Sequence, residues 1–514
     1  MKIERTKNAL RNTKWGVVQR AVHIFLPFLV RTVLIYTLSA EYSGLSSLFT
    51  SILQVLSLTE LGISNAIVFS MYKPIAEENK DKICAILNYY RKAYLFIGVI
   101  ILLLGLSILP VLPKLIKDDI PSNINLYALY LVYLFNTVIS YFLYAYKTCL
   151  LTAHQRADII SKNTLLYSFF LHGFQCLSLL LFRNFYCYVV ILPVSTVVLN
   201  LLNNRAVNKL FPEYKPCGFI TEEERKELKK NILGLAIWKI GGATRNTFDS
   251  IVASAYLGLI AVTIYNNYFY ILNGVNTILG VITSSIIAGV GNKIATESKE
   301  ENYQDFLKFH FLYMWIAGWC CICMMCLYQP FMRLWMGETL MLPNGAMLLF
   351  CYLFLMMKQG DINSVYYQAA GLWWFGKIRS IIEAGLNLVL NLILGKYYGI
   401  TGILFATIIS FTCVYFYGSK FVFTEYFKNG KRLHHYLENM MFFLVTILGG
   451  FITCYIGKRI IAFLDIKSAV IILMVYAVSC LFVPNIIFWG VYSNNKRYRT
   501  YIMDLLHRIM QPRG

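Results

Sequence analysis

Ionisable side chains interrupt the apolar segments of this 514-residue chain, where a charged group is costly. Ten of them lie well inside segments long enough to cross a bilayer, and these are the candidate functional residues: Arg20, His23, Arg31, Glu60, Lys239, Arg245, Asp249, Lys358, Asp361 and Glu383. Insertion into lipid costs about 2.5–3.5 kcal/mol for each Arg, Lys or Asp at the centre of a spanning helix. We therefore expect these side chains to face a hydrated cavity or one another.

Helical spacing groups the basic residues near the N-terminus. Arg20 and Arg31 are eleven residues apart, which places them on one helix face about 16 Å apart along the axis, and His23 lies close to the same face. Arg31 has no acidic residue within four positions, so we expect it to act in substrate binding or gating. Arg20 lies near a helix end, where a long side chain also reaches the membrane surface without any further role.

The acidic residues predict ion coupling or gating. Arg245 with Asp249 and Lys358 with Asp361 have the i,i+4 and i,i+3 spacings of helix ion pairs, and an interhelical pin is the alternative for both pairs. Glu60 has no local partner, so we expect it to pair across helices or to take up a proton. Glu383 lies near a helix end. Like Arg20, it either has a functional role or merely reaches the membrane surface. His172 is interpreted as a buried histidine with a satisfied ring.

Two other kinds of site are not favoured. Four cysteines cluster within 320–326, but no His or carboxylate lies nearby at ligand spacing, so the sequence predicts apolar packing and no metal site. No Gly-x-x-x-x-Gly-Lys-[Ser/Thr] loop is present, which argues against ATP as the energy source.

No cofactor is expected other than a coupling ion, H⁺ or Na⁺. An enzyme of the polymerase or glycosyltransferase type needs a large acidic outer loop, and the chain offers only Asp118–Asp119.

The elements that position these residues are predicted to be transmembrane helices. The chain is 58% hydrophobic and 14% charged, whereas soluble domains are about 45–50% apolar and about 25% charged. Segments of about 20 apolar residues are typical of spanning helices. We count fourteen: 15–38, 45–71, 93–113, 124–146, 163–182, 185–204, 231–255, 259–292, 309–328, 341–370, 380–395, 400–419, 437–457 and 468–492.

The distribution of basic residues predicts the orientation. With the N-terminus inside, the inner segments carry 34 Lys and Arg and the outer segments carry 8, which satisfies the positive-inside rule with both termini cytoplasmic. The net charge of +21 is therefore mostly a topology signal, and its expected partner is anionic lipid of the inner leaflet, not nucleic acid.

The two halves of the chain resemble each other. Gly62–Asn65 and Gly289–Asn292 each end a span, and the loop at 157–161 is echoed at 377–381, at offsets near 220 residues. Repeats of this kind are typical of transporters. We predict an all-α polytopic membrane protein with two six-helix bundles as a parallel repeat: 1–208, a cytoplasmic linker at 209–230, and 231–430. Residues 431–514 add two helices and a basic tail. Thr221 and Glu224 form a capping-box pattern, interpreted as a short surface helix or a solvated linker.

Ordered sequence segments then suggest a family. The segment Gly-Leu-Trp-Trp-Phe-Gly-Lys-Ile-Arg at 371–379 is followed by segments 382–394 and 398–410, and shorter matches stand at 56–63, 72–76, 291–292 and 330–337. Together they resemble Wzx-type polysaccharide (O-antigen) flippases of the MOP superfamily, which also contains the MATE exporters. The stretch from Lys239 to Arg245 has no clear counterpart, and many relatives have twelve helices rather than fourteen.

The resemblance implies a flippase in the bacterial plasma (inner) membrane. Its expected substrate is an undecaprenyl-diphosphate-linked oligosaccharide, moved to the outer leaflet for O-antigen, lipopolysaccharide or capsule biosynthesis. The two bundles would form a V with alternating access, driven by an ion gradient, and a polymerase or chain-length machinery would be a partner. Arginine forks suit phosphate oxygens, so Arg31, Arg20, His23, Arg245, Lys239 and Lys358 are the expected diphosphate site. A MATE-like drug/cation antiporter is the alternative, although it needs an acidic cavity and the spans hold five Lys/Arg against four Asp/Glu.

Overall fold

The computed structural model describes residues 5–60, 62–117, 120–428 and 430–510, and within these the side chains of 5–10, 58–59, 227, 230–231, 233–246, 288, 373–378, 417 and 505–510 lie outside the description. The described chain is helical and contains no strand. It forms two compact units, Met1–Thr263 and Ile264–Gly514. The all-α prediction is therefore confirmed for the part of the chain that is described.

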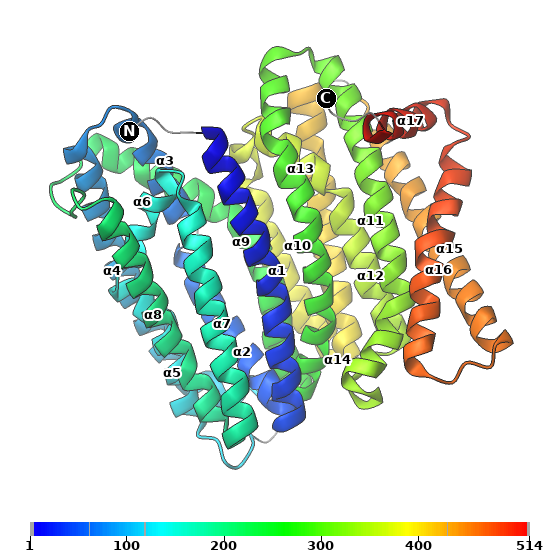
Figure 1. Cartoon of the computed structure of the whole chain (residues 1–514), viewed down its shortest axis with the longest axis horizontal. Coiled ribbons are helices and arrows are strands. Elements are labelled where there is room, and N and C mark those ends of the chain that lie inside the picture. Colours follow the sequence, from blue (N-terminus) through cyan, green and yellow to red (C-terminus); the bar gives the residue numbers. More distant parts are fainter. Residues whose placement is uncertain (1–4, 61, 118–119, 429, 511–514) are drawn as a thin grey trace. The chain divides into compact units, whose positions relative to one another are not determined.

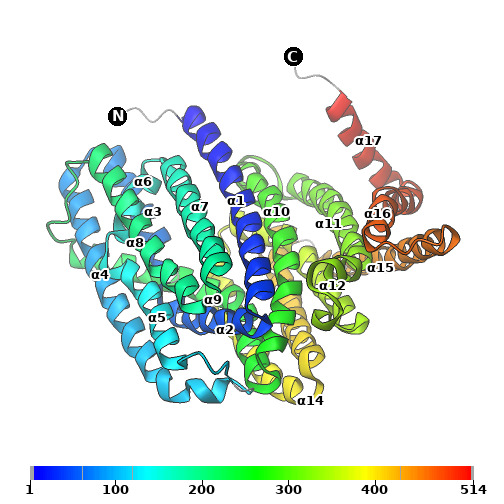
Figure 2. The same ribbon diagram turned by 60° about the horizontal axis from the view of Figure 1, so that its bottom comes forward.

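Unit 1 is built from long helices that run side by side. In Figure 1 and Figure 2, α1 lies along α7, and α7, α8, α5 and α4 follow one another as neighbours. Their contact faces are apolar and buried, with Leu87, Leu129 and Val189 fully enclosed. The helices are α1 (Arg5–Thr37), α2 (Ala40–Leu56), α3 (Ile63–Ala76), α4 (Lys80–Ile108), α5 (Leu126–Phe142), α6 (Thr148–Ala153), α7 (Ala157–Phe182), α8 (Phe185–Leu210) and α9 (Glu222–Leu257), with 3₁₀ turns η1 (Ser57–Glu60), η2 (Leu109–Leu115) and η3 (Ala145–Lys147).

Unit 2 packs its helices around α11. Helices α12, α15 and α16 each lie against α11, and α17 crosses its N-terminal part (Figure 1). The elements are α10 (Leu259–Thr296, whose first five residues belong to unit 1), α11 (Lys299–Met336), η4 (Glu338–Leu340), α12 (Asn344–Gln359), α13 (Asp361–Ala369), α14 (Trp373–Phe421), a π-helical turn η5 (Val422–Phe427), α15 (Arg432–Phe463), α16 (Ala469–Tyr492) and α17 (Lys496–Met510).

Ten helices of the described chain are long and apolar enough to cross a membrane, or eleven with the bent pair α5–α6. Helix α14 counts once among them although it contains a reversal. Gly399 has the non-helical angles φ 59° and ψ −140°, and a Cβ on Gly402 would lie 2.0 Å from the carbonyl oxygen of Leu394. Residues eight positions apart in one straight helix are about 12 Å apart, so α14 is a helical hairpin.

The remaining predicted spans are the broken pair α2–α3, which η1 interrupts, and α9. Neither is among the long apolar helices identified in the described residues. The count of fourteen spans therefore stays a prediction.

The predicted capping box at the linker is confirmed. The Thr221 hydroxyl accepts from the Glu224 backbone N–H at 3.3 Å, and the Glu224 carboxylate accepts from the Thr221 N–H at 3.1 Å. Lys82 of α4 lies 2.6 Å from Glu224, and its hydrogen bond is the main cause that lowers the pKa of this carboxyl group. The prediction of a separate surface helix is wrong, because α9 continues without a break from this cap to Leu257.

Helix α9 also sets the boundary of unit 1. It packs against α2, α3 and the turns η1 and η2, so the compact unit extends past the predicted linker to Thr263. A backbone hydrogen bond from the Lys117 N–H to the Ser254 carbonyl, 3.2 Å long, joins the end of α9 to the segment after η2. The related six-helix halves stay a prediction.

Candidate functional site

Arg31 joins three helices of unit 1. Its guanidinium donates to the Ser47 hydroxyl of α2 at 3.5 Å and to the Thr263 carbonyl of α10 at 3.3 Å. The Thr263 hydroxyl in turn donates to the Ala40 carbonyl at 2.7 Å, directly before α2 continues toward Ser47. Arg31 is half-buried at this junction. The residue that the sequence singled out most strongly therefore stands where α1, α2 and α10 meet.

Arg20 and His23 lie on the same helix, α1, nearer to its N-terminus, and both side chains are exposed. Exposure fits residues that meet a substrate or the membrane surface, and their roles stay a prediction.

Close to the same end of α1, sequence analysis missed a buried carboxylate. Asp158 is 1% exposed and lies 3.1 Å from Arg11, 3.1 Å from Arg156 and 3.8 Å from Lys162. Three cations around one carboxylate tie the start of α1 to the start of α7. In the sequence, the only signal for this site is the loop at 157–161, which the repeat already marks.

Glu60 pairs with residues of other helices, which is one of the two alternatives predicted for it. Its carboxylate accepts from the Tyr94 hydroxyl of α4 at 2.5 Å and from the Tyr141 hydroxyl of α5. The ring of Tyr90 packs edge-on against Tyr94, with ring centroids 4.5 Å apart. Two phenol hydroxyls therefore meet the Glu60 carboxylate among the aromatic rings of α4 and α5 in unit 1. Proton uptake by Glu60 stays a prediction.

The predicted pair of Lys358 and Asp361 is confirmed in unit 2. The ammonium lies 2.5 Å from the Asp361 carboxylate, and the Tyr313 hydroxyl of α11 donates to the same oxygen. The Lys358 side chain is 5% exposed and that of Asp361 is 28% exposed. Gly360 separates α12 from α13 at this point, so the ion pair holds the junction of two short helices. Its position fits a pin within unit 2, and a role of Lys358 in substrate binding stays a prediction.

Asp249 and Glu383 are buried, with 0% and 5% exposure. Asp249 lies on α9 of unit 1, beside the fully buried Ser250. Glu383 lies on the first segment of the α14 hairpin in unit 2, one turn before Asn387, which donates to Thr407 of the second segment at 3.0 Å. The side chains of Lys239 and Arg245 lie outside the described residues, so the Arg245–Asp249 pair stays a prediction.

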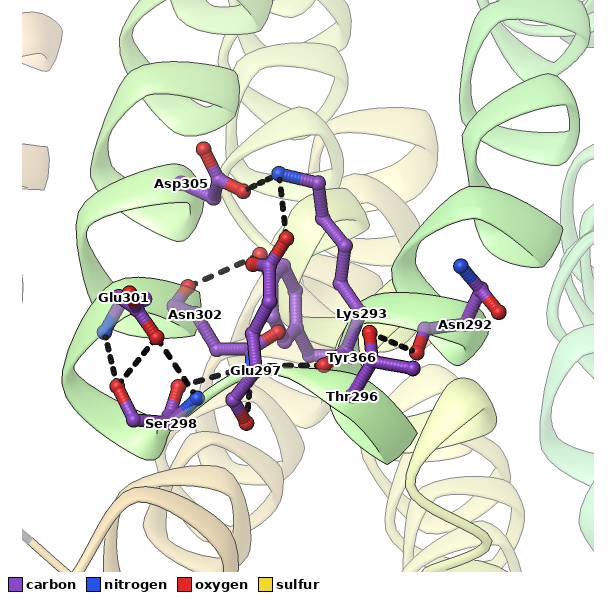
Figure 3. Close-up of polar contacts among 9 residues, drawn as sticks. All are labelled: Asn292, Lys293, Thr296, Glu297, Ser298, Glu301, Asn302, Asp305 and Tyr366. Atoms are coloured by element: carbon purple, nitrogen blue, oxygen red, sulfur yellow. Dashed lines mark hydrogen bonds and ion pairs between the residues drawn. The ribbon is translucent and has the colours of Figure 1, made fainter.

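The turn between α10 and α11 is held by a polar cluster. Figure 3 shows the Lys293 ammonium between the carboxylates of Asp305 and Glu297, the latter at 3.5 Å. The buried Asn302 amide donates to the carbonyls of Lys293, Glu297 and Ser298 at 3.1, 3.4 and 2.9 Å, and Tyr366 of α13 donates to the Asn302 carbonyl at 3.1 Å. This is the polar turn that follows Gly289–Asn292 in the sequence, and it fixes α10, α11 and α13 together.

A second group that sequence analysis missed is a buried histidine pair. His310 of α11 and His435 of α15 are 1% and 0% exposed, and their ring centroids are 4.8 Å apart. Asn439 lies between them, 2.9 Å from His310 Nε2 and 3.0 Å from His435 Nε2. No spacing rule links positions so far apart in sequence. His172, interpreted as a buried histidine, is half-buried, and its ring contacts the Gln175 side chain at 3.2 Å.

Comparison with known proteins identifies the fold. No family model and no curated protein matches the sequence. A multidrug-resistance MATE transporter in an inward-facing conformation superposes with a TM-score of 0.65 at 14% identity, covering 79% of this chain and 96% of that one. The lipid II flippase MurJ in an inward closed conformation superposes with a TM-score of 0.65 at 15% identity, covering 93% of this chain and 99% of that one.

The chain has the fold of MOP superfamily transporters. A third neighbour, a MOP superfamily transporter from Pyrococcus furiosus described as having a binding pocket of reversed polarity, gives a TM-score of 0.54 at 13% identity and covers 81% of this chain and 94% of that one. With its apolar helices, the protein is thus a multi-pass membrane protein, and its structural neighbours are transporters and flippases. The Wzx-type resemblance is finer than this fold likeness and belongs to the proposal below.

Proposed function

We propose that the protein flips an undecaprenyl-diphosphate-linked oligosaccharide to the outer leaflet of the bacterial plasma membrane, for surface polysaccharide synthesis of the O-antigen or capsule type. The observation that carries the proposal is the extent of the structural match. The lipid II flippase covers 93% of the chain, whereas the multidrug transporter covers 79% at the same TM-score. A protein that moves a lipid-linked substrate therefore shares more of this architecture.

The charges inside the helices support an anionic substrate. Arg31 presents a planar guanidinium at the junction of three helices, and such a fork suits the oxygens of a diphosphate. Arg20 and His23 stand exposed on the same helix, where a phosphate can pass from one basic side chain to the next. The transporter from Pyrococcus furiosus, which has the same fold, is described as having a binding pocket of reversed polarity that suggests a different function.

The proposed topology has fourteen spans, two six-helix bundles in a V with alternating access, and both termini in the cytoplasm. The α14 hairpin, the bent α5–α6 pair, the broken α2–α3 pair and α9 supply the four spans beyond the ten long helices. Transport is driven by H⁺ or Na⁺, with Glu60, Asp249, Asp361 and Glu383 as the coupling or gating residues. Anionic lipids and a polymerase or chain-length machinery are the proposed partners.

The second candidate is a MATE-like drug/cation antiporter, which the equal TM-score of the multidrug transporter favours. A single reconstitution experiment separates the two. Proteoliposomes containing the purified protein are loaded with a fluorescent undecaprenyl-diphosphate oligosaccharide or with a cationic dye, and an ion gradient is imposed. The flippase exposes the labelled sugar to an external lectin or quencher, and Arg31→Ala abolishes this exposure. Gradient-driven dye movement without sugar exposure would establish the antiporter instead.

A further inference from the structure

Two thiols from distant parts of the chain meet in unit 2. The Sγ atoms of Cys326 on α11 and Cys454 on α15 are 2.9 Å apart, although the two residues are separated by 128 positions. The Cys326 thiol also faces the Gly450 carbonyl of α15 at 4.0 Å, and Cys480 of α16 lies beside Cys323 and Cys326. Helices α11, α15 and α16 therefore bring cysteines together at one level of the bundle.

A cavity gives access to this pair. It has a volume of about 420 Å³, and both Cys326 and Cys454 line it. Its other walls are mostly apolar, including Met325, Met347 and Ile472, with Gln329 as a polar exception. The polar edge is formed by the exposed side chains of Arg333, Asn344 and Lys458. A small polar molecule entering at that edge reaches both sulfur atoms.

The surroundings favour thiol chemistry over metal binding. Within the described chain, no group of three or more His, Cys, Asp or Glu side chains is arranged to hold a metal ion. A disulfide needs a sulfur–sulfur bond of about 2.05 Å, so the two thiols have to approach by less than 1 Å. Lys458 stands four residues after Cys454 and lines the same cavity, and a nearby cation stabilises the thiolate that attacks a disulfide.

We infer that Cys326 and Cys454 form a redox-active dithiol that closes into a disulfide linking α11 to α15. The oxidant is a small-molecule disulfide that enters the cavity. The Cys454 thiolate attacks one of its sulfur atoms, forms a mixed disulfide and releases one thiol. Cys326 then attacks the Cys454 sulfur and releases the second thiol, so that the protein loses two electrons and two protons and the oxidant becomes two thiols. The inference does not depend on the transported substrate.

The closed disulfide fastens the C-terminal helix pair to α11 within unit 2. Helices α15 and α16 pack on α11, and the bond closes a loop of 128 residues. Long loops gain most from a cross-link, because the unfolded chain loses more conformational entropy. The oxidised protein therefore resists thermal unfolding more than the reduced protein does.

The test is disulfide mapping on the full-length protein in membrane vesicles. The vesicles are treated with 2-hydroxyethyl disulfide, free thiols are blocked with a maleimide, and linked peptides are identified by mass spectrometry without reduction. The 326–454 link should exceed every other cysteine pair by at least about tenfold, since exchange rates depend on access and proximity. The link should disappear in Cys326→Ala and persist in the matched variant Cys320→Ala, which changes the same helix in the same cysteine cluster.

Thermal unfolding of the wild-type protein provides a measurement that needs no variant. The melting temperature should rise on oxidation and return to its original value with dithiothreitol. Recovery of Cys326 and Cys454 as unlinked, maleimide-modified residues would overturn the inference. A dominant link between Cys323 and Cys480 would overturn it as well.

Discussion

Arg31 carries the sharpest prediction at the scale of single residues. Arg31→Ala should abolish transport, and Arg31→Lys should lose most of it, because an ammonium cannot reproduce two donors in one plane. Arg20→Lys is the matched control on the same helix and should be milder, since Arg20 is exposed. Surface polymer is measured in a flippase-null strain and divided by the amount of protein in the membrane. If the Arg31→Ala strain makes a normal amount of surface polymer at normal protein expression, the phosphate-binding role is wrong. Arg31 then only anchors its helix.

The ion pair of Lys358 and Asp361 belongs to the same scale but concerns stability. Asp361→Leu leaves the 5% exposed Lys358 ammonium without its carboxylate, which should destabilise the fold by about 3 kcal/mol. Lys358→Met with Asp361→Leu replaces both charges by apolar groups and should recover most of that loss. Thermal unfolding of the four purified proteins forms the double-mutant cycle. If the double variant is less stable than Asp361→Leu, the ion pair does more than hold the junction of α12 and α13 together.

Sequence reasoning worked for these residues only where the partner was local. The i,i+3 spacing predicted the Lys358–Asp361 pair, because one helical turn fixes the distance. The partners of Glu60 come from 34 and 81 positions away, and the Asn439 contact of His310 spans 129 positions. Such contacts depend on how whole helices pack, and hydropathy along the chain contains no information on that.

At the scale of helices, the close approach of α2 to the α9–α10 turn is testable. A Cβ on Gly44 would lie 2.1 Å from the Leu259 carbonyl oxygen, so the missing side chain allows the two backbones to touch. Gly44→Ala should force α2 away and open this junction, and Gly173→Ala is the control, because nothing lies within 4 Å of its added Cβ. Maleimide labelling of a cysteine introduced at Ser47 should increase in Gly44→Ala only. Equal labelling in both variants would contradict the contact.

Helix type was easier to predict than helix continuity. Long apolar runs dictate helices, because a bilayer leaves no water for backbone groups and only internal hydrogen bonds remain. The reversal at Gly399 falls in the gap between the predicted spans 380–395 and 400–419. The capping box at Thr221 predicts the start of a helix, but its charged first turns give no sign that this helix continues into the apolar segment up to Leu257.

At the scale of the whole molecule, the orientation in the membrane determines the direction of the proposed flipping. One exposed native thiol can report on this orientation. Cys217 lies exposed between α8 and α9, and Ser122 lies exposed between η2 and α5. Helices α7 and α8 and the bent α5–α6 pair separate the two positions. If the bent pair crosses the membrane, the number of crossings is odd and the two positions lie on opposite sides.

We therefore predict that a membrane-impermeant maleimide added to intact cells labels the cysteine introduced by Ser122→Cys and spares Cys217, which reacts only after permeabilisation. Mass spectrometry reads each cysteine separately, so the other thiols need not be removed. Lys147, Arg156 and Lys162 follow the bend, and the positive-inside rule places them in the cytoplasm only if α5–α6 spans the bilayer. Labelling of both positions from the same side would make α5–α6 a re-entrant loop and reduce the span count. If intact cells label Cys217 alone, the orientation in the membrane is opposite to the predicted one, and the proposed direction of flipping is reversed.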